Sequence, residues 1–172
     1  MASTYEPIAT TTLGSDTATI SFTSIPGTYT DLRLVLVART DRASTGNDTV
    51  LLRFNSDSGT NYSYTSITGN GTTATSSLSS TVAQIIAGYA PRNNNTSGIF
   101  GLTTVDIFSY AGSIYKTALC TGNSDLNGSG EVNRTVGLWR STSAITSVTF
   151  SLSSTFKYLT GSTATLYGIL RA

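Results

Sequence analysis

The side chains that most often carry out chemistry in proteins are scarce in this sequence. It contains no histidine, which removes the usual general base, the histidine-based triads and the commonest metal ligand together. The glutamates are Glu6 and Glu131, and most of the seven aspartates fall in predicted turns, where an Asp side chain usually bonds its own backbone. A glycosidase needs two carboxylates facing each other across a cleft, and no such pair is predicted. We therefore expect no catalytic residue, no cofactor and no enzyme activity.

Two single residues have structural explanations that we favour over chemical ones. Asp106 differs from the other aspartates because it lies inside a predicted strand, and we expect it to pair with Arg33 or Lys116. Cys120 is the only cysteine, so no disulfide can form within the chain. We expect this thiol to be buried and to behave as a small hydrophobic side chain.

One loop resembles the first half of a calcium-binding loop. Asp125, Asn127 and Ser129 place oxygen atoms at alternate positions, and the glycine that follows allows a sharp bend. The position that should supply a bidentate acid, eleven residues after Asp125, holds Val136, and the flanking segments are predicted strands. A polar hairpin loop explains the same residues, so we expect no metal here and keep these three only as candidate ligands.

Exposed aromatic rings would matter for sugar binding, because sugars stack on flat rings beside hydrogen-bonding side chains. Tyr62 and Tyr64 are the candidates, on one face of a short predicted strand. Their hydroxyl groups suit a solvated rim, a protein interface or a glycan contact equally well. Trp139, beside Arg140, is instead predicted to be part of the core, because it alternates with Val136, Gly137 and Leu138 in a dense strand.

The charge pattern argues against several kinds of partner. Ten basic and nine acidic residues give a formal net charge of +1, and only 11% of the residues are charged. The basic residues are scattered, whereas a nucleic-acid surface needs them clustered. No run of about 18 apolar residues is present, and the first residues lack the basic start and apolar centre of a secretory signal. We expect no nucleic-acid or membrane partner, and synthesis in a cytoplasm.

Alternation of apolar and polar residues with a period of two dominates the chain and predicts strands. Leu32 to Arg39 is the strongest example, with leucines at every second position. No segment of helical length shows the 3.6-residue period of an amphipathic helix. The Ser- and Thr-rich stretch 68–80 is predicted to be a loop. The other predicted strands are 17–23, 50–54, 82–87, 99–110, 115–120, 135–140, 147–152 and 163–170.

About eight to ten antiparallel strands in one domain predict an all-β fold. Strands at this spacing must close into a sandwich or barrel to hide their edges, and a jelly-roll-like β-sandwich is the commonest two-sheet solution at this size. We expect one domain over residues 1–172. The Thr-rich residues 1–13 are predicted to be an N-terminal arm or an added strand, either in the same copy or in a neighbouring one.

The chain as a whole resembles a family of small β-rich virion structural proteins of tailed bacteriophages, including those that infect cyanobacteria. The resemblance runs from Tyr5 to Leu170 and has no catalytic residue to carry over. Residues 93–97 and 123–133 are the most individual parts of this chain, and we expect them to be loops. The segments that carry the resemblance are YEPIATTTLGS, ISFTSIPGTYTDLRLVLVAR, LLRFNSDSGTNYSYT, VGLWRSTSAITSVTFS and GSTATLYGIL.

The resemblance implies a virion component rather than a metabolic protein. The favoured role is a head decoration or cement protein that binds the major capsid protein on the head exterior and self-associates, most simply as a trimer. The alternative is a tail-fibre or receptor-binding module of carbohydrate-binding type, with a host glycan as its ligand.

Overall fold

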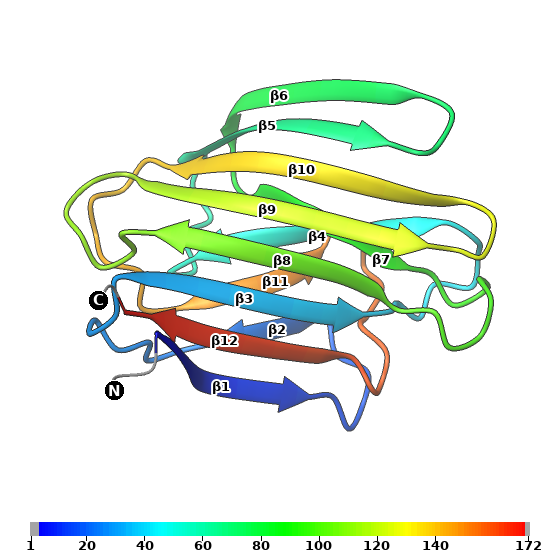
Figure 1. Cartoon of the computed structure of the whole chain (residues 1–172), viewed down its shortest axis with the longest axis horizontal. Coiled ribbons are helices and arrows are strands. Elements are labelled where there is room, and N and C mark those ends of the chain that lie inside the picture. The colour runs from blue at the N-terminus through cyan, green and yellow to red at the C-terminus, as the bar shows by residue number, and fades with distance from the viewer. Residues whose placement is uncertain (1–3, 171–172) are drawn as a thin grey trace.

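The fold is a two-layer β-sandwich, as Figure 1 shows. A computed structural model describes residues 4–170, and within that range it contains twelve strands, all antiparallel, and no helix. The strands are β1 (Tyr5–Thr12), β2 (Thr19–Phe22), β3 (Asp31–Ala38), β4 (Asn47–Phe54), β5 (Tyr62–Gly69), β6 (Ala74–Val82), β7 (Ile85–Pro91), β8 (Gly101–Phe108), β9 (Lys116–Asp125), β10 (Gly130–Trp139), β11 (Val148–Leu152) and β12 (Thr163–Ile169).

The two sheets are unequal in size. The larger has eight strands in the order β1-β12-β3-β8-β9-β10-β5-β6, and the smaller has four in the order β2-β11-β4-β7. The smaller sheet lies behind the larger one in Figure 1, and the β5–β6 hairpin forms one end of the larger sheet. The predicted all-β sandwich is confirmed. Its twelve strands exceed the eight to ten expected, and its division into eight and four differs from an eight-stranded jelly roll.

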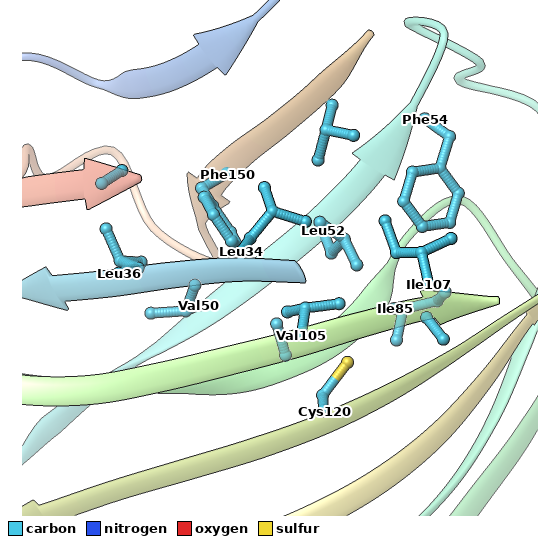
Figure 2. Close-up of a cluster of buried hydrophobic side chains, with 14 of the residues drawn as sticks. Leu34, Leu36, Val50, Leu52, Phe54, Ile85, Val105, Ile107, Cys120 and Phe150 are labelled. Atoms are coloured by element: carbon cyan, nitrogen blue, oxygen red, sulfur yellow. The ribbon is translucent and has the colours of Figure 1, made fainter. Parts of the chain in front are cut away.

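The core lies between the sheets and follows from the alternation seen in the sequence. In β3, Leu32, Leu34, Leu36 and Ala38 are buried while the residues between them are half-buried. Figure 2 shows how residues from both sheets meet in one cluster, with Val50, Leu52 and Phe150 facing Leu34, Val105 and Cys120. Burial of these side chains supplies the main driving force for the fold, at about 25 cal/mol for each Å² of apolar surface.

The two sheets come unusually close where β7 crosses β9. Both sheets have a glycine there, Gly88 in β7 and Gly122 in β9. A Cβ atom built on Gly122 would lie 2.5 Å from the Cα atom of Gly88 and 3.2 Å from the backbone nitrogen of Tyr89. Only glycine leaves room for this approach of two main chains.

A buried arginine organises the loop between β7 and β8. Arg39 follows β3, and only 5% of its surface is exposed. Its guanidinium group donates four hydrogen bonds to backbone carbonyls of this loop. Nη1 bonds Thr96 at 2.8 Å and Ile99 at 3.0 Å, and Nη2 bonds Asn93 at 2.7 Å and Asn95 at 2.8 Å. A guanidinium group suits this role because it has several N–H donors at fixed angles. The predicted loop at 93–97 is thus held in a defined shape.

Two parts of the chain differ from the expectation drawn from sequence. The stretch 68–80, predicted to be a loop, contains the end of β5, a tight turn and most of β6. The stretch 123–133, also predicted to be a loop, is a hairpin in which only residues 126–129 lie outside β9 and β10. Both errors arise because Ser, Thr, Asn and Gly residues paired with a neighbouring strand look the same in sequence as a solvated loop.

The N-terminal segment forms an added strand in its own chain. β1 pairs antiparallel with β12, with Thr10 opposite Thr165 and Thr12 opposite Thr163. The first three residues of the predicted arm lie outside the described residues.

Candidate interaction face

The eight-stranded sheet has one face that nothing else in the described chain covers. Its inner face packs on the smaller sheet, so the alternate residues point away from the core. The strand register places these outward residues in rows across the sheet. One row contains Pro7, Tyr167, Arg33, Asp106, Leu119, Val136, Thr65 and Leu78, one residue from each strand. We call this surface the outer face.

The outer face collects most of the exposed hydrophobic side chains. Among the described residues eight large hydrophobic side chains are exposed, and six of them point outward from this sheet. The other two, Ile114 and Tyr115, lie in the loop between β8 and β9. Scattered exposed hydrophobics are normal, but a gathering on one face indicates a contact surface. The six are Tyr5, Ile67, Leu78, Phe108, Val132 and Val136.

Four of these residues form a continuous patch at one end of the sheet. Ile67, Leu78, Val132 and Val136 come from the adjacent strands β5, β6 and β10, and we call them the apolar patch. Leu78 is 74% exposed, Val132 62% and Ile67 57%. Two shallow depressions adjoin the patch, one of about 370 Å³ beside Leu78 and Val136 and one of about 350 Å³ beside Ile67 and Val132. The apolar patch therefore offers a partner both apolar surface and depressions that its side chains can fill.

Charges on the outer face are few and largely compensated. Arg33 and Asp106 form a bidentate ion pair, with Nε to Oδ1 at 2.7 Å and Nη2 to Oδ2 at 2.9 Å. The hydrogen bonding of Arg33 to the Asp106 carboxylate raises the pKa of Arg33. The guanidinium carbon of Arg33 lies 6.0 Å from the ring centre of Tyr5. The predicted partnership of Asp106 with Arg33 is confirmed. Arg134, between the two valines of the patch, is the exposed cation of this region.

Lys116, the other partner considered for Asp106, lies on the opposite side of the sheet. It is fully buried at the start of β9, and its Nζ donates hydrogen bonds to the backbone carbonyls of Gly112 and Ile114. Loss of hydration lowers the pKa of this amine. Lys116 thus holds the β8–β9 loop in place from the buried side of the sheet.

The structure separates the two tyrosines that the sequence placed together. Tyr62 is fully buried, and its hydroxyl group accepts a hydrogen bond from the backbone nitrogen of Phe54 at 3.0 Å and donates one to its oxygen at 3.1 Å. Its ring stacks on Trp139 at 6.3 Å between centroids. Burial raises the pKa of Tyr62 to about 12. The expectation that Tyr62 contacts a glycan or a partner is wrong, because β5 turns this side chain inward.

Tyr64 keeps part of its surface in solvent. It is half-buried against the core and also lines the depression beside Leu78. The register shift between Tyr62 and Tyr64, where β6 bulges, separates the surroundings of the two rings. Tyr64 therefore remains a candidate contact residue.

Two further predictions about the core are confirmed. Trp139 is 3% exposed, and its indole Nε1 donates a hydrogen bond to Asp57 Oδ2 at 2.7 Å. Hydrogen bonds from Trp139 and Asn61 lower the pKa of Asp57. Cys120 is buried, and burial raises the pKa of its thiol to about 12.

The loop that resembles a calcium site serves as the turn of the β9–β10 hairpin. Asp125 Oδ1 accepts a hydrogen bond from the backbone nitrogen of Asn127 at 2.8 Å, and Asn127 and Gly128 have positive φ angles of 65° and 109°. The side chain of Glu131 points toward β4, where it accepts a hydrogen bond from Asn47 at 2.8 Å. Within residues 4–170 no three His, Cys, Asp or Glu side chains gather as metal ligands would. The three candidate ligands Asp125, Asn127 and Ser129 thus lie at a hairpin turn, as the polar-loop interpretation predicts.

Sequence reasoning missed the apolar patch. Ile67 and Leu78 stand alone among Ser and Thr residues, so neither marks a hydrophobic run. Neither residues 65–69 nor residues 74–78 alternate between apolar and polar side chains. The one sequence signal for a strand here is the run of aromatic and β-branched residues Tyr62, Tyr64, Thr65, Ile67 and Thr68 in β5.

Comparison of the chain with protein-family models, with curated proteins and with solved structures gave no match. In the part of the chain that the structure describes, no helix has the length and hydrophobicity to cross a membrane.

Proposed function

We propose that this chain is a structural protein of a tailed-bacteriophage virion, and that it acts as a head decoration or cement protein that binds the major capsid protein. The observation that carries the proposal is the outer face, where six of the eight exposed large hydrophobic side chains of the described residues gather on one sheet. The resemblance of the chain to small β-rich virion proteins supports its assignment to a phage particle.

The physical properties of the outer face suit a cement protein. A hydrogen-bonded sheet of eight strands is a stiff platform, so little conformational entropy is lost when it docks. Arg33 and Asp106 already neutralise each other, which leaves Arg134 as the exposed cation of the apolar patch. Binding through apolar area rather than through ion pairs would tolerate changes in salt, because apolar contacts are not screened. The partner surface should accordingly be flat, apolar and of low charge.

The proposal is tested by mixing the purified protein with expanded heads that lack it. The double variant V132K/V136K places two charges in the apolar patch without changing a buried residue. Full burial of a valine or leucine contributes about 1.5–3 kcal/mol, so the variant should bind heads at least about tenfold more weakly. Variant G14A, on an exposed turn outside the sheet, is the control and should bind like the natural chain. Failure of the natural chain to bind heads, or its binding only to tails, would refute the head assignment.

A receptor-binding module of a tail fibre is the second candidate function. Tyr64, half-buried beside a depression of about 370 Å³, could stack against a sugar ring. A glycan or host-cell binding assay distinguishes the two proposals. Replacement of Tyr64 with Ala should abolish binding to a host glycan, whereas attachment of a cement protein to heads should be nearly indifferent to this change.

A further inference from the structure

The free edge of β6 differs from most sheet edges in natural proteins. An edge strand presents a row of main-chain N–H and C=O groups, and proteins usually protect it with charges, proline or short length. β6 is nine residues long, with the sequence ATSSLSSTV, and contains no charged residue, proline or glycine. Seven of its nine residues are exposed. The carbonyl of Ser80 accepts a hydrogen bond from Arg140 Nη1 at 2.9 Å, so the segment open to pairing with another strand is 74–79.

The other three sheet edges are protected. β1 has Glu6 and Pro7, and its register with β12 shifts between Pro7 and Ala9. β2 is four residues long. β7 ends at Pro91 and packs against β8, β9 and β10 of the opposite sheet. Pro7 lacks an N–H group, so the edge of β1 pairs poorly with a further strand. Pairing of β6 with the β1 edge of another copy is therefore disfavoured.

We propose that β6 pairs with β6 of a second copy of this chain, antiparallel and about a two-fold axis, so that one sheet runs through both copies. The strand suits itself as a partner because it has no charge to repel its copy. An axis perpendicular to the sheet keeps the two outer faces on the same side. Leu78, the most exposed large hydrophobic side chain of the described residues, then packs beside the second copy.

The register of β6 limits where the axis lies. Regular pairing of β6 with β5 runs from Ala74 to Ser79, and the strand bulges at residues 80–81 before Val82 pairs with Tyr62. Because a bulge disturbs the ladder, the two-fold axis should fall within the regular segment 74–79.

The size of the contact predicts weak, concentration-dependent pairing. The open segment 74–79, at about 3.4 Å for each residue, is roughly 20 Å long, and a sheet is about 10 Å thick. The contact then covers roughly 400 Å² in total, about a third of what a stable interface buries. Copies held side by side on a particle would pair more completely, because their effective concentration is higher. That last point rests on the proposed function, whereas the pairing itself does not.

The experiment compares the mass of three proteins in solution by light scattering and sedimentation, from about 10 µM to about 1 mM, the range in which a contact of this size should associate. They are the natural chain, S76K/L78K on the β6 edge, and V132K/V136K. Both variants add two lysines to exposed positions of the same outer face, but only the first lies on the edge. The natural chain and V132K/V136K should double in mass with concentration. S76K/L78K should not, because lysines on an edge strand oppose pairing.

Three results would overturn the proposal: one constant mass for the natural chain, doubling of S76K/L78K like the natural chain, or equal loss of pairing in both variants. The last would indicate association through the outer face rather than the edge. Pairing of β6 with β6 about a two-fold axis joins copies in twos. It therefore predicts a dimer, or two trimers joined to each other, and not an isolated trimer.

Cysteine cross-linking locates the axis. In a C120A background, S76C, S77C and L78C are compared with T10C on the β1 edge. At least one of the β6 cysteines should form a disulfide between copies faster than T10C, because only residues next to a two-fold axis approach their own copies within disulfide distance. Failure to bind phage heads would leave this result unaffected, so the two proposals fail separately.

Discussion

The contact between Gly122 and Gly88 permits a quantitative test of how the two sheets pack. Replacing Gly122 with Ala would place a methyl group 2.5 Å from the Cα atom of Gly88, about 1 Å inside an ordinary contact. The methyl group would also collide with Oδ1 of the buried Asn133. The Asn133 side chain can rotate, but the main chain of β7 cannot move away in this way. Forcing extra volume into a packed core typically costs about 1–3 kcal/mol. We therefore expect G122A to lower the free energy of unfolding by about 2–3 kcal/mol.

A matched control separates crowding from the general effect of replacing glycine. Gly14 has a negative or extended φ, and a methyl group added there would have no atom within 4 Å. G14A should be neutral or stabilising by up to about 1 kcal/mol, because alanine restricts the unfolded chain. Both variants are measured by urea denaturation at pH 7, with fluorescence of Trp139, the only tryptophan, as the probe. Trp139 is buried and should report global unfolding.

The result that would refute this reasoning is a G122A protein as stable as G14A. It would mean that β7 moves away from β9 at little cost, and that the two sheets are less tightly packed than the structure indicates. Unequal slopes of the two denaturation curves would indicate a changed unfolding transition rather than a simple change in stability.

Three further predictions concern buried polar groups. R39M should lower the free energy of unfolding by about 3–5 kcal/mol, because it removes the guanidinium that holds the 93–99 loop. R39K should rescue little, because the three donors of an ammonium group cannot satisfy four carbonyls. D57A should cost about 1–3 kcal/mol by leaving the indole N–H of Trp139 unpaired, whereas D57N, which keeps an acceptor, should cost less. Stability should fall at alkaline pH, because the folded state raises the pKa of Cys120 from 9.0 to about 12. This contribution is complete below pH 9 and is lost as the pH rises toward 12, so in urea denaturation C120A should show a smaller loss between pH 8 and pH 11 than the natural chain.

Sequence alone determined the all-β class of this protein, because alternation in a buried strand is a strong signal. The burial of the β3 leucines, of Trp139 and of Cys120 each follows from position within a strand. Sequence also predicted a basic partner for Asp106, and the structure chose Arg33 over Lys116. The absence of histidine was equally visible in the sequence, and it removed most catalytic chemistry from consideration.

Only the tertiary structure decided which side chains are exposed and which of them are neighbours on the surface. Tyr62 and Tyr64 are two residues apart on one strand, yet only the bulge and the register show that Tyr62 lies in the core. Leu78 and Val136 lie 58 positions apart and line the same depression on the outer face only because β6, β5 and β10 are adjacent. Whether a polar strand such as β6 pairs on one side or on both depends on which strand lies next to it. That is a property of strand order, which alternation along a single strand cannot encode.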